Sequence, residues 1–152
     1  MFKKAYLAFG SNIGNGEKNV CEAYASLALV PGINPKKLSK MFITEPWGYA
    51  DQPDFTNACC EVETTLSPEA LLGVCLGIEA AMGRKRIIKN GPRIIDIDLI
   101  LYEGETRNSA ELILPHPRYK ERLFVLEPLL DISENGKLLD IDIFGLTQRL
   151  RK

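Results

Sequence analysis

The sequence predicts an α+β fold, and three observations support this prediction. Four short apolar runs, each closed by glycine, proline or polar residues, are typical of strands. Two longer segments between these runs repeat apolar residues at helical spacing. No internal repeat, low-complexity stretch or linker divides the 152 residues, a length that suits one domain with its own core.

We expect the four strands at residues 5–9, 38–44, 55–64 and 94–102. The first runs into a loop at Gly10, and the second stops at Pro46, which has no N–H group to continue a ladder. The loop that follows Pro46 contains Gly48 and Pro53, so the third strand begins only at Phe55.

We expect helices at residues 17–30 and 67–83, of which the second has the clearer boundaries. Ser67 suits the N-cap, Pro68 the first helical position and Glu69 the positive end of the helix dipole, while Gly83 suits the C-terminal end. The residues that face inward repeat at helical spacing and are Leu71, Val74, Cys75, Ile78 and Met82.

The predicted element order is therefore β-α-β-β-α-β, which is the ferredoxin-like pattern of an antiparallel sheet with two helices on one face. Residues after about 105 are expected to form a C-terminal appendage, with short helices near 125–130 and 143–150. Because this architecture carries many activities, the fold does not decide the function.

Composition argues against several classes of protein. Nineteen basic and twenty acidic residues give a net charge of −1, whereas proteins that coat nucleic acid or anionic membranes are usually basic. The N-terminus has no apolar run long enough for a signal sequence or membrane span, so we expect a cytoplasmic protein. The four cysteines form no CxxC pair and the chain has one histidine, which argues against a zinc site and fits a reducing compartment.

The last predicted strand contains the pattern that points most directly to chemistry. Because side chains alternate along a strand, Asp96 and Asp98 are expected on one face, with their backbones roughly 6.5–7 Å apart. Two such carboxylates can hold one Mg²⁺ or bracket two. The alternative is a half-solvated strand whose outer face is acidic. The expected opposite face is Ile95, Ile97, Leu99 and Leu101, and the acidic face is expected to continue with Ile100 and Tyr102.

A cationic loop leads directly into these aspartates. It contains five basic residues and no acidic one: Arg84, Lys85, Arg86, Lys89 and Arg93. Cations beside a carboxylate metal site neutralise the charge of a polyphosphate during its transfer. The alternatives are a solvated basic loop or an RNA-binding one. Together with the aspartates, the loop favours phosphate chemistry.

Two further segments are less specific. The glycine-rich turn after the first strand completes neither a dinucleotide-binding fingerprint nor a phosphate-binding GK[ST] loop. The segment Pro115-His116-Pro117 is followed by three cations that can clamp phosphates, although a lone histidine is also compatible with a structural role.

Together these segments resemble the 6-hydroxymethyl-7,8-dihydropterin pyrophosphokinases of folate biosynthesis. The resemblance covers nearly the whole chain and is most specific in the last two of the matching segments, which are FGSN (9–12), DQPDFTNA (51–58), GRKR (83–86), GPRIIDIDLILY (91–102) and PHPRYKERLFVLEPL (115–129).

The resemblance implies a single pyrophosphokinase domain over residues 1–152, which transfers the β,γ-diphosphate of ATP to the hydroxymethyl oxygen of the pterin and releases AMP. Asp96 and Asp98 match the family's metal ligands, which implies two Mg²⁺ ions. Arg84 and Arg93 match phosphate-contacting arginines with a catalytic role. The other positions expected around ATP are Glu79, Arg86, Lys89, His116 and Arg122.

For the pterin, Phe55 and Phe124 match the two rings that enclose the bicycle, and stacking suits a flat heteroaromatic ligand. Core packing is the alternative interpretation of both rings. Thr44 and Asn57 match the polar groups that contact its edge, and Trp47 is also expected at this site.

Two positions depart from the family pattern. Lys89-Asn90 stands where many members have Arg-Trp, and lysine keeps the charge but not the two-pronged geometry of arginine. Leu76 stands where some members have glutamine near adenine. Neither departure touches the acidic face.

Two other functions remain open from the residues alone. A two-metal nucleotidyl transferase on a ferredoxin-like sheet would also use carboxylates and Mg²⁺, but would release pyrophosphate rather than AMP. A non-catalytic RNA-binding module would display aromatic residues on its central strands, and the stretch from Cys59 to Glu63 has none. The expected partners are therefore the two small substrates, without nucleic acid or membrane. The oligomeric state is open, and a monomer is compatible with the sequence.

Overall fold

The computed structural model describes residues 1–46, 51–83 and 92–151. Its central antiparallel sheet has the strand order β2-β4-β1-β5, with β3 pairing to β4 as well. The strands are β1 (Lys3–Ser11), β2 (Ile33–Leu38), β3 (Phe42–Thr44), β4 (Phe55–Thr64) and β5 (Asp96–Tyr102). With α1 (Gly16–Ala28) after β1 and α2 (Pro68–Ala81) after β4, this order is the predicted ferredoxin-like fold.

Helix α2 begins and ends for the predicted reasons. The Ser67 hydroxyl accepts a hydrogen bond from the Ala70 N–H at 3.1 Å, and Pro68 opens the first turn. Gly83 follows the helix with a φ of +88°, a conformation that costs glycine little. Helix α1 ends two residues before the predicted boundary at Val30.

The predicted strand at residues 38–44 is two strands. Strand β2 begins at Ile33, and β3 follows after a break in which the Ser39 N–H donates to the Cys59 carbonyl and its hydroxyl accepts from the Cys59 N–H. The sequence analysis did not predict residues 33–37 as a strand, and Pro35 lies within them. Proline is tolerated there since β2 lies at the edge of the sheet, where the pairing with β4 shifts register after Pro35.

The predicted alternation along β5 holds for its first half only. Opposite β1, Leu7 pairs with Leu99 and Tyr6 pairs with Leu101, so Ile100 is the extra residue of a bulge. Leu101 consequently packs with Ile100 in the cluster on the acidic face of the sheet, and Tyr102 packs in the opposite cluster. Leu101 was predicted opposite the aspartates and Tyr102 on their face, so both predictions were wrong. The aspartates precede the bulge and keep their predicted common face.

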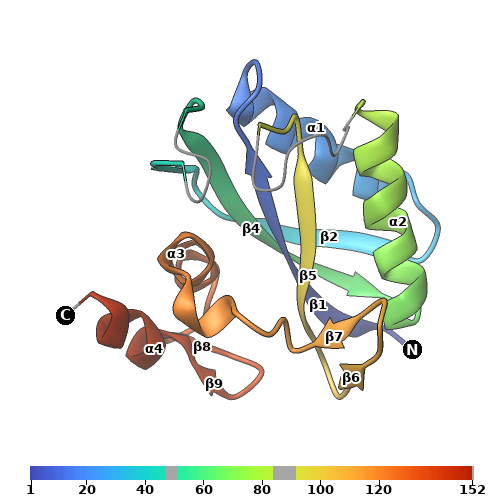
Figure 1. Ribbon diagram of the computed structural model, residues 1–152. Coiled ribbons are helices and arrows are strands. Elements are labelled where there is room, and N and C mark those ends of the chain that lie inside the picture. The colour runs from blue at the N-terminus through green and yellow to red at the C-terminus, as the bar shows by residue number, and fades with distance from the viewer. Residues whose placement is uncertain (47–50, 84–91, 152) are drawn as a thin grey trace.

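Helices lie on both sides of the sheet (Figure 1), and an apolar cluster packs on each of its faces. On one face, α1 and α2 pack over residues such as Leu7 and Ile97. On the other face, α3 (Leu123–Asp131) packs over residues such as Tyr6 and Ile100, and α4 (Ile143–Leu150) packs against α3. The predicted appendage is thus a second covering layer. The adjacent cysteines of β4 divide between the clusters, and Cys21 of α1 is exposed.

The remaining short elements connect β5 to α3 and α3 to α4. They are a hairpin of β6 (Arg107–Asn108) and β7 (Ile113–Leu114), a 3₁₀ turn η1 (Tyr119–Glu121), and a hairpin of β8 (Lys137–Leu138) and β9 (Ile141–Asp142). Within the described ranges, no helix combines the length and apolar character needed to cross a membrane.

Candidate active site

A cavity of about 210 Å³ opens on the acidic face of the sheet, between the ends of β1 and β5, the strands β3 and β4, and helix α3. The aspartates of β5, two arginines, two phenylalanines and the polar pair of β3 and β4 all line it: Asp96, Asp98, Arg93, Arg122, Phe55, Phe124, Thr44 and Asn57. Eight of the predicted site residues are therefore brought together, from segments that are far apart in the sequence.

The arginine that precedes β5 is held between a carboxylate and a ring. Arg93 Nη1 lies 3.4 Å from Asp96 Oδ2, and both side chains are about one-fifth exposed. The Arg93 guanidinium also lies 5.3 Å from the centre of the Phe55 ring, within the range of a cation–π contact. Arg122 has a similar contact with Phe124, at 5.6 Å. Cationic and aromatic groups therefore share this cavity.

The polar pair at the edge of the cavity is fixed by hydrogen bonds. Buried Asn57 of β4 donates through Nδ2 to the Thr44 hydroxyl at 2.7 Å and to the Phe42 carbonyl at 3.4 Å. These bonds orient the amide, so that its carbonyl oxygen has a defined direction. A fixed amide and hydroxyl at the rim of an aromatic cavity are suited to a planar ligand with polar edges.

Asn12, to which the sequence alone assigned no role, ties three segments of the site together. Its side-chain oxygen accepts from the Arg93 N–H at 2.9 Å, and its own N–H donates to the Arg93 carbonyl at 3.0 Å. Its Nδ2 donates to Gln52 Oε1 at 2.8 Å and to the Pro53 carbonyl at 3.0 Å. Asn12 lies in the matching FGSN segment, but its partners are more than 35 residues away, so local pattern could not identify this function.

A second cleft of about 330 Å³ lies on the other side of Asp98. One wall comes from α2, through Leu72, Leu76 and Glu79, and the other from residues 110–117. Asp98 lines both hollows, and His116 lines the second. Asp98 therefore stands at the junction of an aromatic, cationic cavity and a largely aliphatic cleft, and Asp96 lines the cavity only.

Glu79 supports the acidic strand from behind. It is 4% exposed, and its Oε2 accepts the Ile97 N–H at 2.7 Å, between the two aspartates. This bond orients the start of β5.

His116 is attached to the same strand through its backbone, whose N–H donates to the Ile100 carbonyl at 2.9 Å. Burial lowers the pKa of the His116 imidazole, the charges of Arg122 and Arg118 lower it further, and Asp96 opposes the shift. The imidazole is consequently neutral at neutral pH.

The other predicted site residues, Trp47, Arg84, Arg86 and Lys89, lie outside the described residues. Of the residues expected around ATP, Glu79 and His116 line the second cleft, whereas Arg93 and Arg122 line the first cavity.

The donor set at the junction fits magnesium. The described residues form no group of three or more histidine, cysteine or acidic side chains able to hold a metal. Asp96 and Asp98 are the two carboxylates of β5 that line the cavity beside Arg93 and Arg122. Magnesium commonly uses one or two carboxylates and takes its remaining oxygens from phosphates and water.

The fold and the site define a class of protein: an α+β phosphotransferase with an acidic strand whose Asp98 lies between two hollows. The profile of the family described as 7,8-dihydro-6-hydroxymethylpterin-pyrophosphokinase matches residues 6–134, and the chain belongs to this family. Enzymes of this family transfer a pyrophosphoryl group from ATP to hydroxymethyldihydropterin and are generally magnesium-dependent.

Curated relatives carry the same description. The chain is 47% identical over 146 residues to a 2-amino-4-hydroxy-6-hydroxymethyldihydropteridine pyrophosphokinase of Methylorubrum extorquens, covering 96% of this chain and 89% of the relative. It is 42% identical to the enzyme of that name from Bacillus subtilis, covering 86% and 78%. A folic acid synthesis protein of Schizosaccharomyces pombe is 46% identical over 131 residues, which cover 86% of this chain but 18% of that longer protein.

Solved structures agree in fold. A crystal structure described as HPPK-DHPS in complex with substrates superposes with a TM-score of 0.72 at 14% identity, and wild-type HPPK-DHPS of Plasmodium falciparum with pteroate gives 0.73 at 15%. Each match covers 98% of this chain. The chain spans less than half of the two crystal chains, 43% and 42% respectively.

Proposed function

We propose that this chain transfers the β,γ-diphosphate of ATP to the hydroxymethyl oxygen of 6-hydroxymethyl-7,8-dihydropterin and releases AMP, within a single domain over residues 1–152. The observation that carries the proposal is the position of Asp98, which lines both the aromatic cavity and the aliphatic cleft. A group-transfer site needs one substrate on each side of the charge-stabilising groups, and this junction has that form.

The aromatic cavity is assigned to the pterin. Phe55 and Phe124 provide the stacking surfaces, and Asn57 with Thr44 provides the polar contacts at the ring edge. Trp47 is assigned to the same substrate from its position in the family motif. Arg93 and Arg122 lie over these two rings, so cationic groups stand beside the proposed stacking surfaces.

The aliphatic cleft is assigned to the nucleoside part of ATP. Leu72 and Leu76 supply an apolar wall, while neutral His116 also lines the cleft. The phosphates then extend toward the cations of the site. Those assigned to them are Arg84, Arg86, Lys89, Arg93 and Arg122.

Asp96 and Asp98 are proposed to hold two Mg²⁺ ions. When bound, these ions neutralise the phosphate charge that otherwise repels the attacking oxygen. Arg93 is close enough to exchange its contact with Asp96 for a contact with phosphate, because its guanidinium is 3.4 Å from that carboxylate and its backbone is fixed by Asn12. Glu79 keeps the strand between the aspartates in place.

No described side chain is assigned as a general base for the pterin hydroxyl. Holding the hydroxyl oxygen and the phosphorus in line, with the charge neutralised, is able to supply most of the acceleration in phosphoryl-type transfers.

The decisive experiment is identification of the nucleotide product. The purified protein is incubated with ATP, Mg²⁺ and the reduced hydroxymethylpterin, with a parallel reaction that omits the pterin. The expected result is AMP and pterin diphosphate in equal amounts, and no AMP without the pterin. Release of pyrophosphate with an AMP-linked product would instead identify a nucleotidyl transferase.

A further inference from the structure

The two walls of the aliphatic cleft differ in how they are attached to the protein. Helix α2 packs on the sheet through a continuous apolar stripe that includes Leu71, Cys75 and Ile78. The opposite wall begins in the β6–β7 hairpin, which forms a separate two-stranded sheet. The connection between Asn108 and Ile113 is exposed apart from Leu112, so Leu112 and Leu114 are the apolar anchors of this hairpin in the core.

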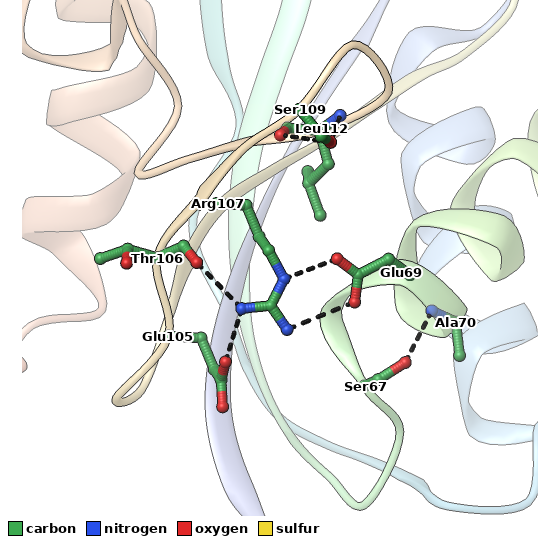
Figure 2. A network of polar contacts seen from close by, with 8 residues as sticks. All are labelled: Ser67, Glu69, Ala70, Glu105, Thr106, Arg107, Ser109 and Leu112. Carbon is green, nitrogen blue, oxygen red and sulfur yellow. Dashed lines mark hydrogen bonds and ion pairs between the residues drawn. The ribbon is translucent and has the colours of Figure 1, made fainter.

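Arg107 connects this hairpin to α2 (Figure 2). Its Nε lies 2.6 Å from Glu69 Oε2 and its Nη2 lies 3.3 Å from Glu69 Oε1, which is the two-pronged geometry of arginine on a carboxylate. Its Nη1 donates to Glu105 Oε1 at 2.6 Å and to the Thr106 carbonyl at 2.9 Å. One guanidinium therefore ties the base of the hairpin to the first turn of the helix.

The other partner of the contact is equally well fixed. Glu69 lies in the first turn of α2, directly after the Ser67 cap that holds the Ala70 N–H. The same helix presents Leu72, Leu76 and Glu79 to the cleft over the following turns. On the other side, the chain continues from Arg107 through Ala110 to Ile113, which line the opposite wall. The contact thus spans the two walls at one end of the cleft.

We propose that Arg107 is a positioning residue that sets the separation of the two cleft walls and thereby the affinity for the nucleotide. This inference rests on the proposed function, because it takes the cleft to be the nucleoside site. Arg107 does not line either hollow, so it acts through the hairpin and not by touching a substrate.

A purely structural ion pair is the competing interpretation. The Arg107 side chain is 30% exposed, and partly exposed ion pairs often contribute little to stability. The two interpretations differ in which substrate is affected. A positioning role weakens nucleotide binding selectively, whereas a structural role lowers thermal stability and affects both substrates alike or neither.

The test compares Arg107→Ala with Arg107→Lys, Glu69→Gln and the Arg107→Ala/Glu69→Gln double variant. For each, the Kd for MgATP, both KM values, kcat and the melting temperature are measured. Arg151→Ala is the matched control, because Arg151 of the α4 C-cap forms a comparable ion pair with Glu127, at 2.9 Å, remote from the cleft.

We expect Arg107→Ala to raise the Kd and KM for ATP roughly threefold to tenfold, with the pterin KM and kcat within about twofold of wild type. Lysine can reach one carboxylate at a time, so Arg107→Lys is expected to be intermediate. The double variant should bind ATP no more weakly than Arg107→Ala, since both substitutions remove the same contact.

An unchanged ATP affinity in Arg107→Ala, or an equal rise in both KM values, would overturn the inference. A fully additive effect in the double variant would do so as well. If the wild-type protein neither binds MgATP nor forms AMP, it is the proposed function that fails, and this appears in the wild-type measurements before any variant is compared.

Discussion

The two hollows that meet at Asp98 are held in shape by different kinds of contact. The aromatic cavity is built on β1, β3, β4 and β5 of one continuous sheet with α3 on one side, and its rim is fixed by the hydrogen bonds of Asn12 and Asn57. The aliphatic cleft has one wall on α2 and the other on a hairpin outside that sheet, joined by the contacts of Arg107. The difference indicates that the cavity proposed for the pterin is preorganised, whereas the shape of the cleft proposed for the nucleotide depends on a few partly exposed side chains.

The largest effect is expected from a substitution of Asp98, the residue that lines both hollows. Asp98→Asn removes a charge needed at the junction, so we expect kcat to fall by roughly 10³-fold or more while the melting temperature changes little. Steady-state AMP formation and thermal unfolding measure the two effects. Asp140→Asn is the control, because Asp140 is exposed near the β8–β9 hairpin. Appreciable AMP formation by Asp98→Asn would remove this residue from the metal site.

The second prediction concerns the aromatic side alone. Phe124→Ala removes one stacking surface, and we expect the pterin KM to rise roughly 10- to 100-fold, with ATP affinity nearly unchanged. Titration with each substrate separates these quantities. Phe144→Ala, at a half-exposed phenylalanine on α4, should change neither. Equal losses for both substrates would show that the Phe124 ring supports the core and not the pterin.

The third prediction concerns the segments joined by Asn12. Asn12→Ala leaves the Arg93 N–H without its acceptor and releases the loop at residues 52–53, so we expect kcat to fall roughly tenfold. Single-turnover measurement of AMP formation tests whether the slow step is the transfer. Asn34→Ala on the exposed edge of β2 is the matched control. A normal transfer rate in Asn12→Ala would limit Asn12 to a structural role.

The smallest expected effect is a pH dependence of stability that originates in the aliphatic cleft. Burial, with Arg122 and Arg118, lowers the pKa of His116 below 6.5 in the folded protein. Between that lowered pKa and 6.5 the unfolded chain binds the proton more readily, so stability is lost as the pH falls through this window. Urea unfolding at about pH 7.5 and about pH 5.5 should show a smaller loss for His116→Gln than for wild type. An identical loss would exclude this contribution.

Local sequence pattern predicted the elements whose signals are short in range. The boundaries of α2 followed from Ser67, Pro68 and Gly83, and the common face of Asp96 and Asp98 followed from alternation. Local pattern did not predict the features that depend on how one strand pairs with another. The bulge at Ile100 depends on the register of β5 against β1, and β2 continues through Pro35 because it lies at the edge.

By itself, the sequence determined the element order, the carboxylate pair and the family resemblance, because each depends on residue type and spacing within a short segment. Only the tertiary structure decided that Asp98 lines two hollows, that Asn12 joins three segments, and that Arg107 joins the two cleft walls. These contacts connect residues between 38 and 81 positions apart. Residues so far apart in the sequence are brought together by the packing of the whole chain, so the periodicity of one segment cannot predict their contacts.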